Sequence, residues 1–144
     1  MENSVALKSE FQTSVSEVVS GLSNTGSMEE KALLYNAVNS TDEALRDQVG
    51  KVLNLKNFVV HKIEVVNEQT GEVTHPYRCV LIDENNVTYG ATSQGIAQAL
   101  QKLIGIMGMP EKWEKPIPIK ISKARGRKGF EFLTFSIVMG GASV

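Results

Sequence analysis

The sequence predicts a β-rich domain of five strands with one helix between the third and fourth strands. From Glu29 onward, short runs of alternating apolar and polar residues are separated by turn residues, which is typical of strands with one buried face. A single stretch, residues 92–107, has its apolar residues at helical spacing instead. With 144 residues, 42% of them hydrophobic, the chain is long enough for one such domain and a short extension.

Residues 1–27 precede this pattern and are expected to form an N-terminal tail, a helix followed by a linker. Five apolar residues recur there at spacings of three and four, as on one face of a helix: Leu7, Phe11, Val15, Val18 and Leu22. Since five strands and one helix already close a core, we expect this stripe to bind a second copy of the chain. The alternative is that it folds back over its own domain.

The five predicted strands cover residues 31–39, 52–66, 77–82, 117–123 and 130–138. The second run is long for a single strand, so a bulge or bend is expected within it. Its alternation places Leu53, Leu55 and Val65 on the buried face, and Lys56 and Phe58 on the exposed face.

Turn residues at 67–76 and 83–86 separate the middle strands, and a short extension leads into the helix. A helix between the third and fourth of five strands is the connectivity of the OB-fold, a small β-barrel. We therefore expect an OB-fold domain over residues 28–139, with a loose end over residues 140–144.

The charge is unevenly distributed along the chain. The formal net charge is −1, but residues 1–100 carry 7 Lys and Arg against 13 Asp and Glu, whereas residues 101–144 carry 8 against 3. A local positive field matters more to a polyanion than the sum over the molecule, because salt screens charges beyond about 10 Å. The C-terminal part is therefore the expected contact for nucleic acid.

The last two predicted strands have the features of a single-strand binding surface. Phe130 and Phe132 alternate with the core residues and are expected on the outer face, beside a basic turn at 123–129. Exposed aromatic rings stack on bases, and cations contact phosphates. The cations expected to do so are Lys120, Arg125, Arg127 and Lys128. The alternatives are that the Phe rings pack on protein and that the turn is simply a solvated hairpin tip.

Further aromatic residues are candidates for base stacking. Trp113 lies in a loop between two prolines and is flanked by lysines, which suits stacking, although it is equally suited to covering the end of a barrel. Phe58 is expected to share an exposed face with Lys56. Tyr35 and Tyr77 are weaker candidates, and Tyr35 fits the core better.

The residues needed for catalysis or metal binding are not grouped in the sequence. His61 and His75 have no Cys, Asp or Glu at metal-ligand spacing, and Cys79 lies in an apolar run where an inert buried thiol is expected. We therefore expect no enzyme activity, no metal and no cofactor. A single cysteine, no signal-peptide pattern and no apolar stretch of membrane-spanning length indicate a cytoplasmic protein that does not bind membranes.

Leu34-Tyr35-Asn36-Ala37, Val87-Thr88-Tyr89-Gly90, the helix after them and the basic hairpin carry a resemblance to a known family. Over residues 30–138 the chain resembles the single-stranded-DNA-binding proteins of Gram-positive conjugative plasmids and related phages with protein-primed replication. The resemblance implies an OB-fold that coats single-stranded DNA in replication or conjugative transfer, and it implies that Tyr89 stacks on a base.

The chain departs from the housekeeping bacterial single-strand binders, which end in an acidic recruiting tail, because its last residues contain no acid. We accordingly expect no recruiting role of that kind. Two other functions remain open from the sequence, an OB-fold accessory factor that binds proteins and an RNA-binding OB domain. Stacking and phosphate contacts alone do not distinguish DNA from RNA.

Overall fold

The computed structural model describes residues 19–22, 26–126 and 129–138. Its main sheet follows the order β2-β7-β6-β3-β8-β9, with β1 paired to β3. The strands are β1 Val19–Ser20, β2 Glu43–Ala44, β3 Val52–Lys62, β6 Tyr77–Asp83, β7 Thr88–Thr92, β8 Ile117–Arg125 and β9 Glu131–Ile137. The remaining elements are α2 Met28–Asn39, α3 Gln94–Met107, the two-stranded β4 Val65–Val66 and β5 Val73–Thr74, and 3₁₀ turns at Leu45–Gln48 and Pro110–Lys112.

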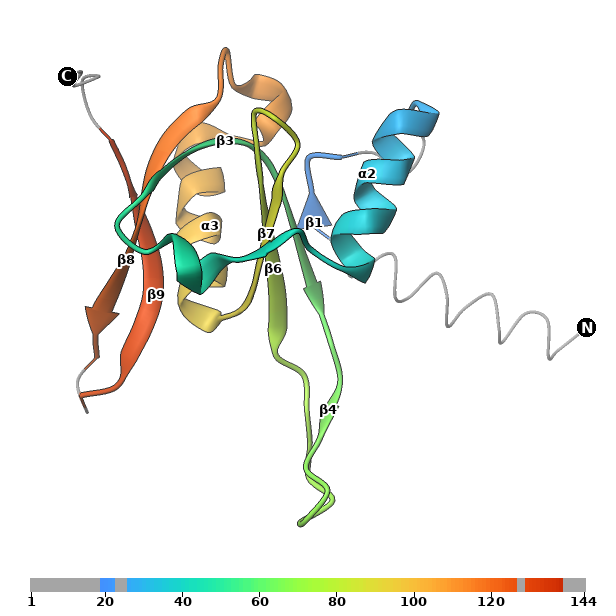
Figure 1. Cartoon of the computed structure of the whole chain (residues 1–144), viewed down its shortest axis with the longest axis vertical. Coiled ribbons are helices and arrows are strands. Elements are labelled where there is room, and N and C mark those ends of the chain that lie inside the picture. Colours follow the sequence, from blue (N-terminus) through green and yellow to red (C-terminus); the bar gives the residue numbers. More distant parts are fainter. Residues whose placement is uncertain (1–18, 23–25, 127–128, 139–144) are drawn as a thin grey trace, which may run out of the picture.

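The sheet curls into a half-barrel around α3 (Figure 1). Three long strands precede α3 and two follow it, and β3 pairs antiparallel with both β6 and β8, so the predicted OB-like order is confirmed. The described strands do not close the barrel through a ladder between β7 and β9. Instead, Ala91 of β7 and Leu133 of β9 line opposite parts of a groove of about 520 Å³.

The prediction of a strand at residues 31–39 is wrong, because this segment lies entirely within helix α2. Its start has a capping signal: the Ser27 hydroxyl accepts a hydrogen bond from the Glu30 amide at 3.1 Å, and acidic residues occupy the first turn. One face, with Leu33, Leu34 and Ala37, packs on the outer side of the sheet. The third long strand is therefore β7, which the sequence indicated only as a short extension.

The bulge predicted in the second run is confirmed, and it reverses the faces beyond it. The register of β3 with β6 shifts between Leu55 and Asn57, so Leu55 and Phe58 both point inward. Phe58 is fully buried, so its predicted exposure is wrong. Val65, predicted to be buried, is 44% exposed because the run leaves the main sheet after Lys62.

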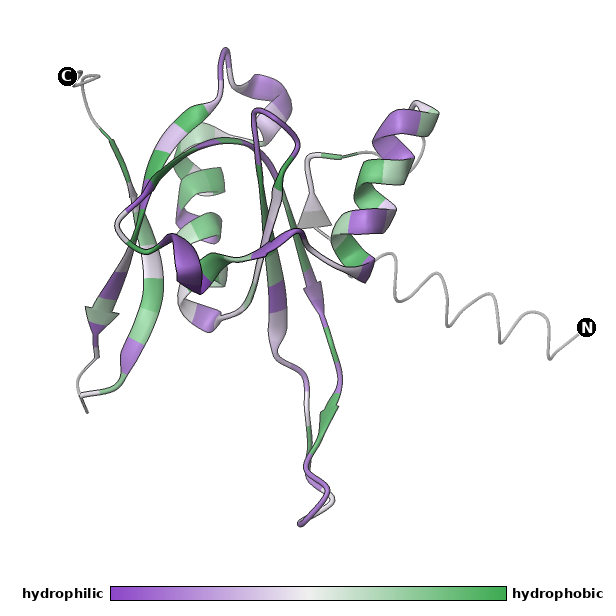
Figure 2. Ribbon diagram, in the orientation of Figure 1, coloured by the Kyte–Doolittle hydropathy of each residue, from purple (hydrophilic) through white to green (hydrophobic). Residues whose placement is uncertain are grey.

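Two apolar clusters cover both faces of β3 and β6. The inner cluster joins Leu53, Leu55, Phe58, Cys79, Leu81 and Tyr89 to Ile96, Leu100 and Leu103 of α3 and to Ile117, Ile119 and Ile121 of β8. The outer cluster joins Val59, Val80 and Ile82 to Ala37 of α2, with Leu22, Leu33 and Leu34 packed against it. Hydrophobic residues accordingly lie along α3 and the strands around it (Figure 2). The predicted helix at residues 92–107 and the predicted strand at residues 117–123 are confirmed.

The free edge of β9 is covered by the start of α3. A Cβ atom built on Gly95 would lie 2.3 Å from the Leu133 carbonyl oxygen and 2.8 Å from the Phe132 ring. Only glycine permits this approach of helix and strand. An exposed strand edge is a site for unwanted pairing, so this contact protects β9.

Two hairpin arms project from the same end of the half-barrel (Figure 1). The first, residues 63–76, carries β4 and β5, and the second is the end of the β8–β9 hairpin around residues 123–131.

Among the described residues, no helix has both the length and the apolar character needed to cross a membrane.

Candidate nucleic-acid interface

The β8–β9 hairpin presents aromatic and cationic side chains on its two faces. The register pairs Lys120 with Ser136 and Ala124 with Phe132, so Lys120 and Phe132 share the outer face. Phe130 is 73% exposed and Phe132 is 42% exposed. Arg125 pairs with Glu131 on the opposite face and is exposed. The structure thus brings four of the predicted contact residues onto one hairpin.

Phe132 combines packing with exposure. Its ring lies near two glycines: a Cβ atom on Gly95 would be 2.8 Å from it, and one on Gly126 would be 3.7 Å away. The ring also lines a groove of about 370 Å³ between α3 and β9, together with Lys102. The Phe132 ring therefore packs partly on protein and is partly exposed for stacking, whereas the Phe130 ring is open to solvent.

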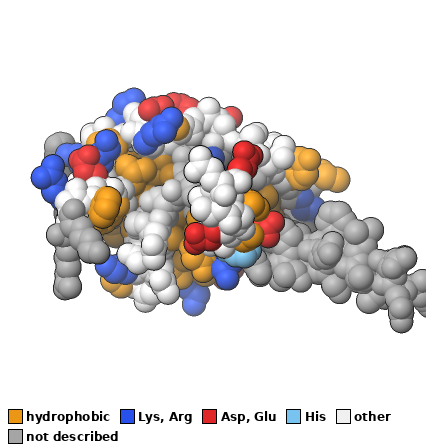
Figure 3. Space-filling model, turned by 90° about the horizontal axis from the view of Figure 1, so that it is seen from below, with side chains coloured by type: hydrophobic (Ala, Val, Ile, Leu, Met, Phe, Trp, Pro, Cys, Tyr) orange, Lys and Arg blue, Asp and Glu red, His pale blue; other side chains and the backbone are white. Residues whose placement is uncertain are grey.

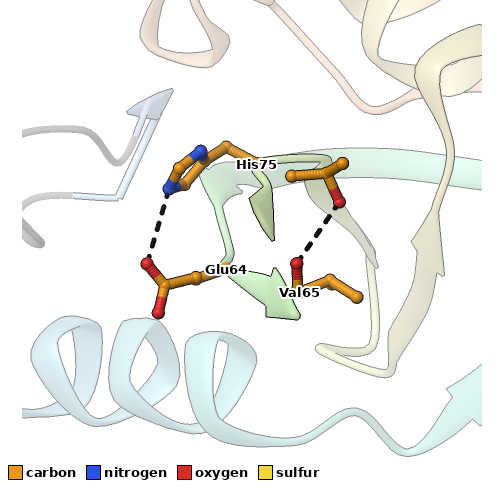
Figure 4. Close-up of polar contacts among 4 residues, drawn as sticks. Glu64, Val65 and His75 are labelled. Carbon is orange, nitrogen blue, oxygen red and sulfur yellow. Dashed lines mark hydrogen bonds and ion pairs between the residues drawn. The ribbon is translucent and has the colours of Figure 1, made fainter. Parts of the chain in front are cut away.

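The two arms have opposite charge. The residues 63–76 include Glu64, Glu68 and Glu72 and no Lys or Arg. Within this arm, His75 Nε2 lies 3.6 Å from Glu64 Oε1, and the Thr74 hydroxyl donates to the Val65 carbonyl at 3.5 Å (Figure 4).

Viewed from the end that carries the arms, Lys and Arg side chains gather over the β8–β9 hairpin. Acidic side chains gather on the β4–β5 arm, and hydrophobic ones lie between the two (Figure 3). A phosphate chain is therefore attracted to the hairpin side of this face and repelled by the arm.

Two predicted base-stacking residues are buried and are not available for stacking. Phe58 is 0% exposed and lies in the inner cluster, because the bulge in β3 turns its side chain inward. Tyr89 is 7% exposed, and its hydroxyl donates to Asp83 Oδ2 at 2.9 Å. Burial, with a contribution from this hydrogen bond, raises the pKa of Tyr89 to about 12. The structure thus gives both rings a place in the core.

Trp113 follows the 3₁₀ turn Pro110–Lys112, and Lys56 lies at the bulge of β3. The Trp113 indole donates from Nε1 to the Gly108 carbonyl at 2.9 Å and packs against the inner cluster, which favours the interpretation that it covers the barrel end. Lys56 is half-buried, and its Nζ donates to Asn86 Oδ1 in the β6–β7 turn. Neither residue adjoins the basic hairpin.

Part of the predicted set lies outside the described residues. This holds for Arg127 and Lys128 of the basic turn, and for Leu7, Phe11, Val15 and Val18 of the N-terminal stripe. Leu22 is described, and it packs on the outer cluster of its own domain rather than standing free for a second copy.

The Cys79 thiol is buried in the inner cluster. Burial raises the pKa of the Cys79 thiol to about 12, so it remains protonated at neutral pH. Within the described part of the chain, no three His, Cys, Asp or Glu side chains cluster as they would around a metal ion.

An OB-like half-barrel that bears exposed aromatic rings beside a cationic hairpin belongs to the class of proteins that bind single-stranded nucleic acid. A family model described as Phage Single-stranded DNA-binding protein matches residues 12–138. The chain belongs to this family of DNA-binding proteins, and its function is to bind single-stranded DNA in replication. Searches of curated proteins and of solved structures gave no match.

Proposed function

We propose that the β8–β9 hairpin is the main contact between this protein and single-stranded DNA. The exposure of Phe130, at 73%, is the observation that supports this most, because an exposed ring beside cations offers a stacking surface for a base. Arg125 and Lys123 are exposed on the same hairpin and supply phosphate contacts, as Lys120 does further along β8. Such a surface binds strands with little regard to sequence.

A salt titration tests this surface. Each phosphate neutralised on a single strand contributes a slope of about −0.7 to log affinity against log salt. The variant with Arg125, Arg127 and Lys128 replaced by Ala together should bind all sequences more weakly and have a slope smaller by about 2. The variant Lys51→Ala, K112A and K115A removes three cations elsewhere on the chain and controls for net charge. If both triple variants behave alike, the hairpin is not the contact.

We further propose the setting in which this binding occurs. The protein coats single strands exposed in the cytoplasm during replication or conjugative transfer of a phage or plasmid genome, and it does so without catalysis. The apolar stripe Leu7, Phe11, Val15 and Val18 would join neighbouring copies, which raises the effective concentration of the next copy on the same strand.

A further inference from the structure

A second groove opens on the same end of the half-barrel, between α3 and the inner face of β3 and β6. Its volume is about 350 Å³, and its floor is apolar, with Phe58, Val60 and Leu100. Tyr77 lies at its mouth and is 41% exposed. We call it the Tyr77 groove. Its size falls within the range of small-ligand sites, which combine an apolar floor with a few polar groups.

Tyr77 has a cation beside its ring. Lys62 is its direct cross-strand partner, and the Lys62 Nζ lies 5.9 Å from the centroid of the Tyr77 ring. Both residues follow Phe58 and Val60 on the inner face of the sheet, because the bulge in β3 precedes them. An aromatic ring with an adjacent ammonium group offers a stacking surface to a base and a contact to its phosphate.

Three glutamines form the polar wall of the groove. Gln94, Gln98 and Gln101 are spaced by four and three residues, so they lie on one flank of α3, and all three are exposed. A glutamine amide carries two donors and an acceptor, which match the mixed donors and acceptors on the edge of a nucleobase. A hydrocarbon ligand would form no hydrogen bonds with these amides.

Gln98 connects the two parts of this face. It lines both the Tyr77 groove and the groove beside β9 that contains Phe132 and Lys102. A DNA strand that leaves the β8–β9 hairpin can thus cross the first half of α3 and reach Tyr77 without passing the tip of the acidic arm.

Resting on the proposed hairpin contact, we propose that the Tyr77 groove is a nucleobase subsite. One base of the bound strand stacks on Tyr77, its phosphate lies near Lys62, and its edge is hydrogen-bonded by the glutamine row. A strand that reaches this subsite is bound more tightly than one held by the hairpin alone.

Fluorescence anisotropy of a labelled oligo-dA at fixed salt tests the subsite. Tyr77→Ala should weaken binding about 5- to 150-fold, since a stacked base is lost, while the salt slope stays unchanged. Tyr77→Phe should retain most of the affinity, because the stacking surface remains. Gln101→Ala should weaken binding about 2- to 10-fold through a lost hydrogen bond. Tyr35→Ala, which removes a 67% exposed tyrosine on α2, is the matched control and should bind as wild type.

The outcomes separate this subsite from the hairpin contact. If Tyr77→Ala binds as wild type while the hairpin triple variant loses affinity, the subsite is refuted and the hairpin contact stands. If Tyr77→Phe loses as much affinity as Tyr77→Ala at an unchanged melting temperature, stacking is refuted. If the hairpin triple variant binds as wild type, the hairpin contact fails independently of Tyr77.

Discussion

At the scale of single residues, the aromatic side chains divide into core and surface by the register of their strands. Phe58→Ala should lower the free energy of unfolding by about 3–5 kcal/mol, because it empties a fully buried site. Phe130→Ala should change it by less than about 0.5 kcal/mol and should weaken DNA binding about 5- to 150-fold. Urea denaturation and anisotropy measure the two quantities. A Phe130→Ala protein that is destabilised and binds normally would contradict this division.

His61 makes stability depend on pH. It is buried opposite Arg78, and among the described residues its Nε2 has no hydrogen-bond partner. Burial, and then the charge of Arg78, lower its pKa below 6.5. His61 of the unfolded chain therefore binds a proton near pH 6.5, whereas His61 of the folded protein binds one only at lower pH. The free energy of unfolding is therefore highest above pH 6.5 and falls as the pH drops below it.

Urea denaturation at pH 7.5 and pH 5.5 measures this effect. Wild type should be less stable at pH 5.5, and His61→Leu should lose most of that difference. His75→Gln replaces an exposed histidine and is the matched control for the loss of a histidine side chain. An equal pH dependence in His61→Leu and wild type would assign the effect to other groups.

At the scale of elements, the contact of α3 with β9 depends on one glycine. Gly95→Ala should lower stability by about 1–3 kcal/mol, since its Cβ would press on the backbone of Leu133. Gly105→Ala in the same helix meets nothing within 4 Å and should raise stability by about 0.4–1 kcal/mol. Chemical denaturation of the two variants compares them directly, and a gain at both positions would show that β9 does not approach α3 so closely.

The elements also show which parts of this fold the sequence predicts. Helix α3 and strand β8 were predicted because their apolar residues keep one period from end to end. Strand β3 was predicted with its bulge but not with the bulge's position, and one residue of uncertainty reverses every face after it. For the same reason Phe58 was assigned to the surface, and Lys62 was not seen as a partner of Tyr77.

Helix α2 was missed for a different reason. Its apolar residues Leu33, Leu34 and Ala37 have helical spacing, but the run is short and was interpreted as a strand, and the Ser27 cap before it was not used. The cationic, aromatic hairpin was predicted because its residues are neighbours in sequence. The Tyr77 groove joins three segments far apart in the chain, so no local pattern reports it.

At the scale of the whole molecule, the N-terminal segment decides the assembly state on DNA. Deleting residues 1–18 keeps β1 and Leu22 and removes Leu7, Phe11, Val15 and Val18. We expect smaller assemblies by light scattering, with and without a long oligonucleotide, and less cooperative binding. Replacing those four residues by Ser in the full-length chain should have the same effect. If the truncated protein assembles as the full chain does, other surfaces join the copies.

The position of β3 between β6 and β8 has a consequence for how the chain folds as it is synthesised. Val52 pairs with Lys120 and Leu55 with Ile117, so the first part of β3 pairs with residues that are synthesised much later. Until then the part of β3 that pairs with β8 has an unpaired edge, which invites association with other nascent chains. A topology with such distant pairing folds slowly compared with a helical bundle. The pairing of β3 is therefore complete only after β8 has been synthesised.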